Sequence, residues 1–598
     1  MRRFGSKQSR GCAGRPTVRA GVALAVSGAL LLSGCGVFGS DDGPMDKFAA
    51  AFNEGDVAAA AEQTTDPAAA RETLQAVFDG IGDTEAHMDA PDGDGAALPT
   101  EFDWTVPAGD TVHTEGTITL SPDESRVQWS PQIIDARLQP GGGIVYSDVR
   151  RFTAPVVDRT GVDLMHWAPV TQVVVDAGNL AAAGPVADAV AAVEPSITAQ
   201  QIQDAVAADP AAPYTVITLR AEDLDPIRGA LEAVDGVQLI EQGKLITAGR
   251  NLDSPVFGDL REYWRGELDK GAGWSLTVSN PEGDAQIGGK APAPLDAVRT
   301  TMDLTMQAAA QRAVDARTEP AAIVAMSPET GGVLAVAQNE AARQQGPIAL
   351  TGLFPPGSTF KTVTTSAALQ AGVAEPDSVL PCPARVTVDG RSIPNDDDFD
   401  LGKVPLHTAF AQSCNTTQAI MSADLGPSAM RDTAASLGFG VDFVTPALTT
   451  VTGTVPVTEP GPARVEAAIG QGTVTASPFG ITEMVASLAN GGHMVLPMLV
   501  EGEPATADQQ PPPLEPGTVD AVRAMMREAV QSGTARSLSD IDRLGGKTGT
   551  AEVSGGPAHG WFAGIRGDVA FTAFIQGADS SGPAVAMAGD FLRGTQNG

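Results

Sequence analysis

The stretch that most constrains this chain covers residues 354–361 and reads F-P-P-G-S-T-F-K. Two prolines and a glycine end any preceding element, and the run that follows favours a helix from Ser358 that would end near Gly372. Ser358 and Lys361 are three residues apart, so one helical turn places both side chains on the same face. A neutral lysine amine there can take the proton of the serine hydroxyl and make it a nucleophile.

A serine and a lysine at this spacing are weak evidence alone, because a capping serine followed by a solvated lysine gives the same letters. Two later patterns strengthen the evidence for a catalytic serine. Ser413-Cys414-Asn415 reads S-x-N, and Lys547-Thr548-Gly549 reads K-T-G. Each occurs once in the chain, and both follow the S-x-x-K pattern in a fixed order.

This order resembles the signature of penicillin-binding proteins and serine β-lactamases. Other segments resemble class B penicillin-binding proteins in particular. They are residues 299–303 (R-T-T-M-D), 307–311 (Q-A-A-A-Q), 469–472 (I-G-Q-G), 477–478 (S-P), 547–552 (K-T-G-T-A-E) and 559–564 (H-G-W-F-A-G). The resemblance is strong over the C-terminal part of the chain and looser before it.

The resemblance implies a multidomain α+β protein whose C-terminal domain has a serine β-lactamase and transpeptidase-like fold, an antiparallel sheet with helices on both sides. The residues agree with this. Two apolar runs flank a turn at 327–331, as a hairpin would, and three more strands are expected near the C-terminus at 547–553, 560–565 and 569–576. Strands from both ends of the domain would then meet in one sheet.

The resemblance also implies roles for individual residues. Ser358 would be the catalytic nucleophile, Lys361 its base, and Ser413 a bridge between the two lysines that relays a proton. The substrate-binding residues would be Asn415, Lys547, Thr548, Gly549 and Thr550, with the backbone N–H groups of Ser358 and Thr550 as the oxyanion hole. Gly549 lacks a side chain, so a peptide could pair with that strand edge. No metal and no cofactor is expected.

The implied reaction is acyl transfer. A D,D-transpeptidase would join peptidoglycan stem peptides ending in D-Ala-D-Ala through an acyl-enzyme, and β-lactams would acylate the same serine. Two alternatives stay open: a β-lactamase or carboxypeptidase, which would deliver the acyl group to water, and a non-catalytic penicillin sensor or scaffold. The expected partners are stem peptides, β-lactams and cell-wall synthesis proteins, including a glycosyltransferase.

Charge and lysine usage narrow the function further. The chain has 38 basic and 73 acidic residues, a net charge of −35, which argues against a nucleic-acid partner. Only eight of the 38 basic residues are lysines, yet two of these lie inside the motifs. An arginine could not replace Lys361, because a guanidinium does not lose its proton in proteins.

The N-terminus is typical of a targeting segment. Several arginines precede an apolar run at residues 20–32, which is short for a membrane-spanning helix and ends in L-S-G-C at Cys35. This ending resembles the lipobox of exported bacterial lipoproteins, so Cys35 would be the lipidation site and membrane anchor. The alternative is an uncleaved signal anchor. Either way, the body of the protein would lie on the outer face of the cytoplasmic membrane.

At 598 residues the chain is too long for one core. The expected segments begin with a signal peptide at 1–34 and a tether at 35–44. Residues 127–131 (V-Q-W-S-P) and 138–141 (L-Q-P-G) resemble a nuclear-transport-factor-like domain, which implies an α+β domain of that kind at 45–150. The family resemblance implies a dimerisation or pedestal domain at 151–298 and a transpeptidase domain at 299–598. The nuclear-transport-factor-like domain is expected to be a spacer or, alternatively, to hold a ligand-binding pocket. The pedestal would begin at residues 151–161 (R-F-T-A-P-V-V-D-R-T-G), which resemble the family's R-G-x-I-x-D-R-x-G motif. Phe152 stands where that motif has its first glycine.

Two cysteines remain in the transpeptidase domain, Cys382 and Cys414. Thiols oxidise outside the membrane, so a disulfide between them is favoured, and it would hold the Ser413 loop. Two buried free thiols are the alternative, because sequence gives no distance between them. The acidic run at 395–400 is expected to be a solvated loop.

Overall fold

The computed structural model describes residues 43–89, 91–93 and 95–595, which divide into two compact units. The first runs through Tyr146 and includes Leu276–Gly288, and the second comprises Ser147–Ser275 and the chain from Gly289 onward. The expected boundary at residue 150 lies near this division. Residues 276–288, however, fall in the first unit, and the expected boundary at residue 298 separates no units. Cys35 lies outside the described residues.

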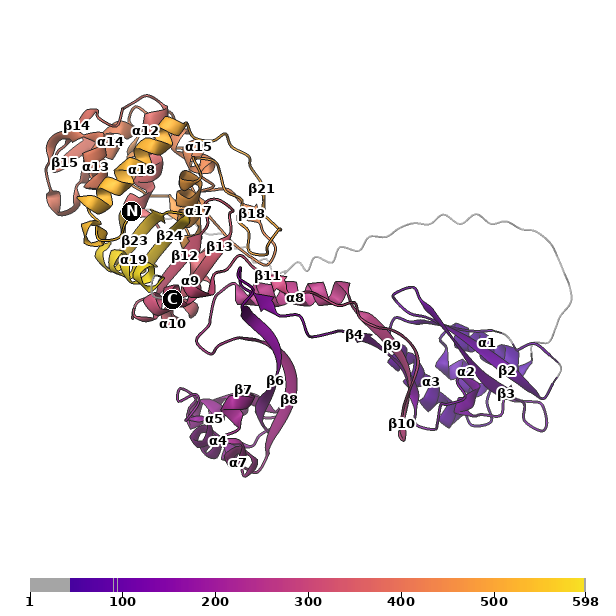
Figure 1. Cartoon of the computed structure of the whole chain (residues 1–598). Coiled ribbons are helices and arrows are strands. Elements are labelled where there is room, and N and C mark those ends of the chain that lie inside the picture. Colours follow the sequence, from indigo (N-terminus) through magenta and orange to yellow (C-terminus); the bar gives the residue numbers. More distant parts are fainter. Residues whose placement is uncertain (1–42, 90, 94, 596–598) are drawn as a thin grey trace, which may run out of the picture. The chain divides into compact units, whose positions relative to one another are not determined.

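The first unit packs three helices against a meander of three strands (Figure 1). The elements are α1 (Pro44–Asn53), α2 (Val57–Glu62), α3 (Pro67–Ile81), β1 (Glu85–Met88), β2 (Ala97–Thr105), β3 (Thr111–Thr119) and η1 (Pro131–Ile133). Asp56 and Asp66 cap α2 and α3. Phe52 packs edge-on against Phe102 and Trp104 in the core. After β3, Val127 forms isolated bridges to Thr64 and Leu120 and belongs to no strand of the described structure.

A hairpin far along the sequence completes the first unit. Strands β9 (Gly273–Asn280) and β10 (Gly283–Lys290) form a sheet with β4 (Gly143–Val149), in the order β10-β9-β4. The Asn280 side chain accepts the N–H of Gln139 and donates to the carbonyl of Arg137. These hydrogen bonds explain why the hairpin groups with the N-terminal part of the chain.

The second unit begins with a sheet in the order β11-β5-β6-β7, with β8 on the other edge of β6. The elements of this region are β5 (Val156–Val157), β6 (Asp163–Val175), η2 (Leu180–Ala182), α4 (Ala183–Val190), α5 (Ala199–Ala208), β7 (Tyr214–Arg220), α6 (Ala221–Leu224), α7 (Arg228–Glu232), β8 (Val237–Thr247), α8 (Phe257–Lys270) and β11 (Val298–Arg299). Phe152 stacks on Trp167 with ring centroids 4.2 Å apart, so the residue that replaces glycine in the motif is part of an aromatic cluster.

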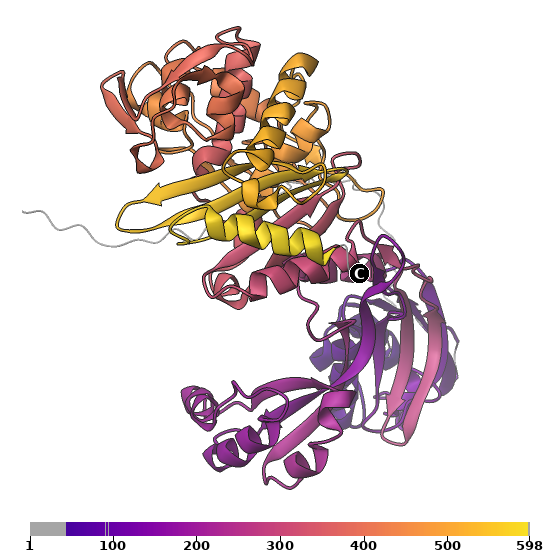
Figure 2. The same cartoon turned by 60° about the vertical axis from the view of Figure 1, so that its left-hand side comes forward.

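A five-stranded antiparallel sheet in the order β13-β12-β24-β23-β22 forms the centre of the C-terminal domain. Its strands are β12 (Ala321–Met326), β13 (Val333–Gln338), β22 (Gly545–Val553), β23 (Gly556–Arg566) and β24 (Val569–Ile575). The helices α9 (Leu304–Asp315) and α19 (Gly582–Gly594) cover one face, and the buried helix α17 (Pro478–Ala489) packs on the other (Figure 2). This confirms the expected fold class and all five strands.

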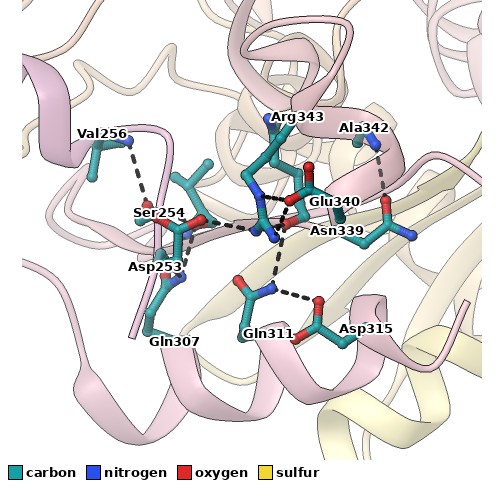
Figure 3. Close-up of polar contacts among 12 residues, drawn as sticks. Asp253, Ser254, Val256, Gln307, Gln311, Asp315, Asn339, Glu340, Ala342 and Arg343 are labelled. Atoms are coloured by element: carbon teal, nitrogen blue, oxygen red, sulfur yellow. Dashed lines mark hydrogen bonds and ion pairs between the residues drawn. The ribbon is translucent and has the colours of Figure 1, made fainter. Parts of the chain in front are cut away.

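A polar network joins the segment before α8 to this sheet (Figure 3). The Gln307 side-chain amide accepts the N–H of Val336 and donates to its carbonyl, both at 2.8 Å, so it pairs with edge strand β13 as a further strand would. The same amide donates to the carbonyl of Asp253, and Ser254 Oγ donates to that of Val336. These bonds fasten the two predicted domains together and explain their grouping in one unit.

The remaining elements form a mostly helical region beside the sheet. They are α10 (Glu340–Arg343), α11 (Ile348–Thr351), η3 (Gly357–Phe360), α12 (Lys361–Gln370), β14 (Val379–Cys382), β15 (Arg385–Val388), β16 (Arg391–Pro394), η4 (Asp396–Asp398), β17 (Gly402–Pro405), α13 (Leu406–Ala411), α14 (Asn415–Ser422), α15 (Ala429–Ser436), β18 (Phe443–Val444), β19 (Gly453–Thr454), α16 (Pro462–Ala467), β20 (Thr475–Ala476), β21 (Thr506–Ala507), α18 (Pro516–Gln531) and η5 (Arg536–Leu538). None of the helices in the described part of the chain is both long and apolar enough to cross a membrane.

Candidate active site

The turn that carries Ser358 is a 3-10 turn, η3, and the α-helix begins only at Lys361. The sequence predicts an α-helix from Ser358 onward, so the first turn differs. A 3-10 helix has about three residues per turn, which places side chains at i and i+3 directly above one another. Ser358 and Lys361 are therefore aligned more closely than a regular α-helix would place them. Ser358 is partly buried.

Two glycines bring this turn against strand β22. A Cβ on Gly357, whose φ is +52°, would lie 2.4 Å from the carbonyl oxygen of Thr550. A Cβ on Gly549 would lie 2.9 Å from both the Pro356 oxygen and the Thr359 methyl carbon. Gly549 was expected to leave room for a peptide, but in this structure the space that its side chain would take is filled by the η3 turn.

Lys361 is fully buried, and three oxygen atoms surround its amine. Nζ lies 2.6 Å from both the carbonyl oxygen of Ser413 and Oδ1 of Asn415, and 3.2 Å from Ser413 Oγ. Burial lowers the pKa of Lys361 well below its usual value, and the nearby charge of Lys547 lowers it further, against a smaller opposing effect of Asp396. A neutral amine has two N–H groups and one lone pair. The two shortest contacts can use both N–H groups, which leaves the lone pair to accept a proton.

Ser413 connects the two lysines. Its Oγ lies 2.9 Å from Lys547 Nζ as well as 3.2 Å from Lys361 Nζ. Its backbone has a φ of +60°, a conformation that non-glycine residues adopt rarely and that often occurs at functional sites. This conformation lies in the turn between α13 and α14, and it lets the carbonyl and the hydroxyl of one residue both contact Lys361.

Lys547 is the second buried amine of the site. Burial lowers its pKa to about 7, and Nζ also donates to the carbonyl of Thr548 at 2.9 Å. The amine lies 5.7 Å from the centre of the Phe410 ring, which adds a cation–π attraction when the amine is protonated. Lys547 can therefore be charged or neutral near pH 7, depending on what binds beside it.

Asn395 holds the S-x-N segment in place. Its side chain is buried, its Oδ1 accepts the N–H groups of Asn415 and Thr416, and its Nδ2 donates to the carbonyls of Pro383 and Phe399. The sequence placed Asn395 in a solvated loop, and for this residue the prediction is wrong. An acidic neighbourhood gives no local signal of a buried asparagine, because its partners are backbone groups up to 21 residues away.

A disulfide joins Cys382 in β14 to Cys414 at the start of α14, with a Cα–Cα distance of 6.2 Å. Both sulfur-bearing residues are completely buried. Cys414 lies between Ser413 and Asn415, so the bond fixes the backbone of the motif to a neighbouring strand. Together with Asn395, it limits how far the oxygens around Lys361 can move.

Threonine hydroxyls extend the site along β22. Thr548 Oγ1 lies 2.7 Å from Thr534 Oγ1, and Thr550 Oγ1 accepts the N–H of Ser581 at 3.1 Å. The second bond fixes the Thr550 side chain and leaves its own O–H hydrogen to donate to a ligand. Thr534 was missed by the sequence analysis, because it belongs to none of the three motifs.

The structure thus brings together residues from motifs far apart in the sequence. Lys361, Ser413, Asn415 and Lys547 form one hydrogen-bonded group, and contacts between η3 and β22 place Ser358 beside Thr550. Among the residues that the structure describes, no group of three or more His, Cys, Asp or Glu side chains is arranged to hold a metal ion.

Two family descriptions match this chain. The penicillin-binding protein transpeptidase domain matches residues 321–589, and the NTF2-like N-terminal transpeptidase domain matches residues 41–141. The first includes the whole hydrogen-bonded group around Lys361. The second coincides with the helices and the meander of the first unit.

Similar proteins include the peptidoglycan D,D-transpeptidase PbpA of Mycolicibacterium smegmatis, 28% identical over 40% of this chain and 57% of the relative. PbpA of Mycobacterium tuberculosis is 29% identical over 35% of this chain and 46% of the relative. The chain thus spans about half the length of these curated relatives.

One similar solved structure comes from work on the structural coordination of polymerization and crosslinking by a peptidoglycan synthase complex. The match covers 77% of this chain and 92% of the chain in that structure. Its TM-score is 0.55 at 23% identity, which supports the fold. On the two matched domains, their order and these relatives, the chain is similar to class B penicillin-binding proteins, with a transpeptidase domain behind an NTF2-like domain.

Proposed function

We propose that this protein is a serine D,D-transpeptidase that crosslinks peptidoglycan stem peptides through an acyl-enzyme on Ser358. The observation that carries the proposal is the buried Lys361 amine, one 3-10 turn from Ser358, with two of its three oxygen partners matched to N–H groups. A buried amine with a lowered pKa can act as a general base near neutral pH. The PbpA relatives are peptidoglycan D,D-transpeptidases, which agrees with this reaction.

In the proposed acylation, one proton moves from Ser358 to Lys361 and from there to the leaving group. Lys361 takes the proton of the Ser358 hydroxyl, and Oγ attacks the carbonyl carbon of the penultimate D-alanine. The C–N bond to the terminal D-alanine then breaks, and the proton passes from Lys361 through the Ser413 hydroxyl to the leaving amine. The backbone N–H groups of Ser358 and Thr550 would stabilise the oxyanion, each by about 3–4 kcal/mol.

Substrate recognition would use the K-T-G strand. A protonated Lys547 and the hydroxyls of Thr548 and Thr550 suit the terminal carboxylate of a stem peptide, because a charged amine and O–H donors match its oxygens. Asn415 would bind the peptide through its side chain and keep Lys361 in place. An amine of a second stem then attacks the ester and returns the proton to Ser358, which completes the crosslink. A β-lactam would acylate Ser358 by the first half of this sequence.

The proposed location is the outer face of the cytoplasmic membrane. The basic and apolar N-terminal segment and the L-S-G-C sequence at Cys35 support export and lipid attachment. Partners in wall synthesis, including a glycosyltransferase that supplies the glycan strands, follow from the proposed reaction.

The test is a crosslinking assay on uncrosslinked glycan strands that carry pentapeptide stems, with the products identified by mass spectrometry. We expect crosslinked dimers and free D-alanine from the wild type, and neither from Ser358→Ala. Tetrapeptides without crosslinks would identify a carboxypeptidase. Labelling by fluorescent penicillin without either product would identify a sensor or scaffold, and both results would contradict the proposal.

A further inference from the structure

A cavity of about 310 Å³ lies at the start of β22, and none of its lining residues belongs to the three motifs. We call it the arginine pocket. Its lining residues are Arg523, Met526, Arg527, Arg543, Gly545, Ile565 and Gly567. The volume is at the lower end of the range for small-ligand sites, about 300–1,000 Å³.

Three arginines from two separate segments face this one space. Arg523 and Arg527 lie one turn apart on α18, and Arg543 lies in the turn before β22 with a φ of +56°. A Cβ on Gly545 would lie 3.3 Å from the backbone nitrogen of Arg527, so the glycine lets α18 approach the strand closely. The backbone thus holds the Cα atoms of all three arginines close to one cavity.

The arginines are poorly neutralised by the protein. Neither Arg523 nor Arg527 forms an ion pair with a carboxylate of the described residues, and Arg523 donates a 3.4 Å hydrogen bond to the carbonyl of Ala489. Arg543 pairs with its neighbour Asp542, but both side chains are more than 80% exposed, where such pairs are weak. In a chain with 73 acidic and 38 basic residues, three arginines without a strong partner are unexpected.

Three acidic residues close in sequence to the pocket residues bond to other parts of the protein. Glu528 bonds to His407, Asp540 to Arg593, and Asp568 to Ser327 Oγ and the N–H of Glu329. Asp568 follows the pocket residue Gly567 directly, so its orientation toward Ser327 removes the carboxylate that could most easily have neutralised the pocket. The positive charge therefore remains available to an outside ligand.

We propose that the arginine pocket binds a small phosphate-class anion, with a diphosphate as the best match. Each guanidinium presents a planar set of N–H donors that fits two phosphate oxygens at once, whereas one carboxylate would satisfy one arginine. Three such groups around one cavity match an anion with several negative charges. The source is either a free anion or the phosphate of a lipid headgroup. This site is independent of the proposed transpeptidase reaction.

The experiment is calorimetric titration of inorganic pyrophosphate into the purified full-length protein at low ionic strength. We expect saturable binding at one site, and at least a tenfold loss of affinity in the double variant Arg523→Gln/Arg527→Gln. Titration with a water-soluble, short-chain phosphatidic acid separates the two sources: tighter binding than pyrophosphate indicates a lipid headgroup, and weaker binding a free anion.

The matched control is Arg312→Gln/Arg431→Gln, which removes the same charge from helices α9 and α15 outside the pocket. It should bind pyrophosphate as the wild type does. If the control loses as much affinity, or if the wild type shows no saturable binding, the proposal is wrong. All variants should keep fluorescent-penicillin labelling, and the single variant Arg543→Gln, at an exposed side chain, provides the test if the double variant does not fold.

Discussion

At the scale of single residues, the site depends on two amines that share one hydroxyl. Lys361 and Lys547 are both fully buried, and Ser413 Oγ contacts both. Two protonated amines this close repel one another, so the charge on Lys547 favours the neutral form of Lys361. One residue can then serve as a base while the other remains available to bind a carboxylate.

The first prediction follows from this division of roles. Lys361→Arg keeps a positive charge but places a group that cannot lose its proton at the position of the base. We expect the rate of acylation by a fluorescent penicillin to fall at least about 100-fold, the lower end for loss of a general base. Lys403→Arg, at an exposed site on β17, is the control and should acylate at the wild-type rate. Comparable rates for the two variants would contradict the role of Lys361.

A second prediction concerns Glu483, which is fully buried in α17. Burial raises its pKa to about 8, and Oε2 has no hydrogen-bond partner among the described residues. The folded protein therefore keeps a proton that the unfolded chain loses near pH 4.5. The stability that Glu483 contributes is complete below pH 4.5 and is lost as pH rises to about 8, with a total on the order of 5 kcal/mol.

Glu483→Gln should remove this pH dependence, since the amide does not titrate. Urea unfolding at pH 5 and pH 8.5 measures it: the drop in unfolding free energy between the two should be several kcal/mol smaller in Glu483→Gln than in the wild type. Glu329→Gln, at an exposed position, should reproduce the wild-type drop. An unchanged drop in Glu483→Gln would show that the carboxyl is ionised in the core.

At the scale of elements, the turn between α13 and α14 is held from outside by an asparagine and a disulfide. Motif spacing predicted which residues meet at the site, and the hydrophobic pattern predicted the strands of the sheet. The 3-10 turn at Ser358, the fit of Gly549 against that turn and the burial of Asn395 were not predictable, because each depends on contacts between segments distant in sequence.

Asn395→Ala tests whether Asn395 holds the turn between α13 and α14. The change removes five hydrogen bonds and leaves the N–H groups of Asn415 and Thr416 without an acceptor, which costs about 1–3 kcal/mol for each unsatisfied group. We expect slower penicillin acylation as well as lower stability. Asn53→Ala, which removes a similar amide bridge to the backbone of Met88 in the first unit, should lower stability without slowing acylation. If Asn395→Ala is acylated as fast as Asn53→Ala, Asn395 supports the fold but not the reaction.

The disulfide gives a separate prediction. Cys382→Ala/Cys414→Ala should lose on the order of 3–4 kcal/mol of stability in the chain-entropy model, since the bond closes a loop with a separation of 32 residues. Thiol titration of the unfolded, non-reduced mature protein should find neither cysteine free. Two free thiols would exclude the bond and leave Asn395 as the main support of the motif.

At the scale of the whole molecule, the comparisons and the described residues account for an NTF2-like domain and a transpeptidase domain, with a region between them that packs into one unit with the second. The sequence predicted this order of domains from short motifs. It did not predict that the hairpin at Leu276–Gly288 would return to the first unit, because the pairing depends on Asn280 and backbone groups near residue 139. Amino-acid composition and hydrophobic periodicity carry no information on such long-range strand pairing.

The last prediction concerns the proposed attachment to the membrane through Cys35, which lies outside the described residues. If the L-S-G-C segment is a lipobox, mature protein should begin at a Cys35 that carries acyl chains, and it should partition into detergent. Cys35→Ala should accumulate as an uncleaved precursor without acyl chains, whereas Cys12→Ala, upstream of the cleavage site, should mature normally. Intact-mass measurement of protein from membranes distinguishes these forms. A mature N-terminus other than a modified Cys35 would favour the uncleaved signal anchor or another processing site.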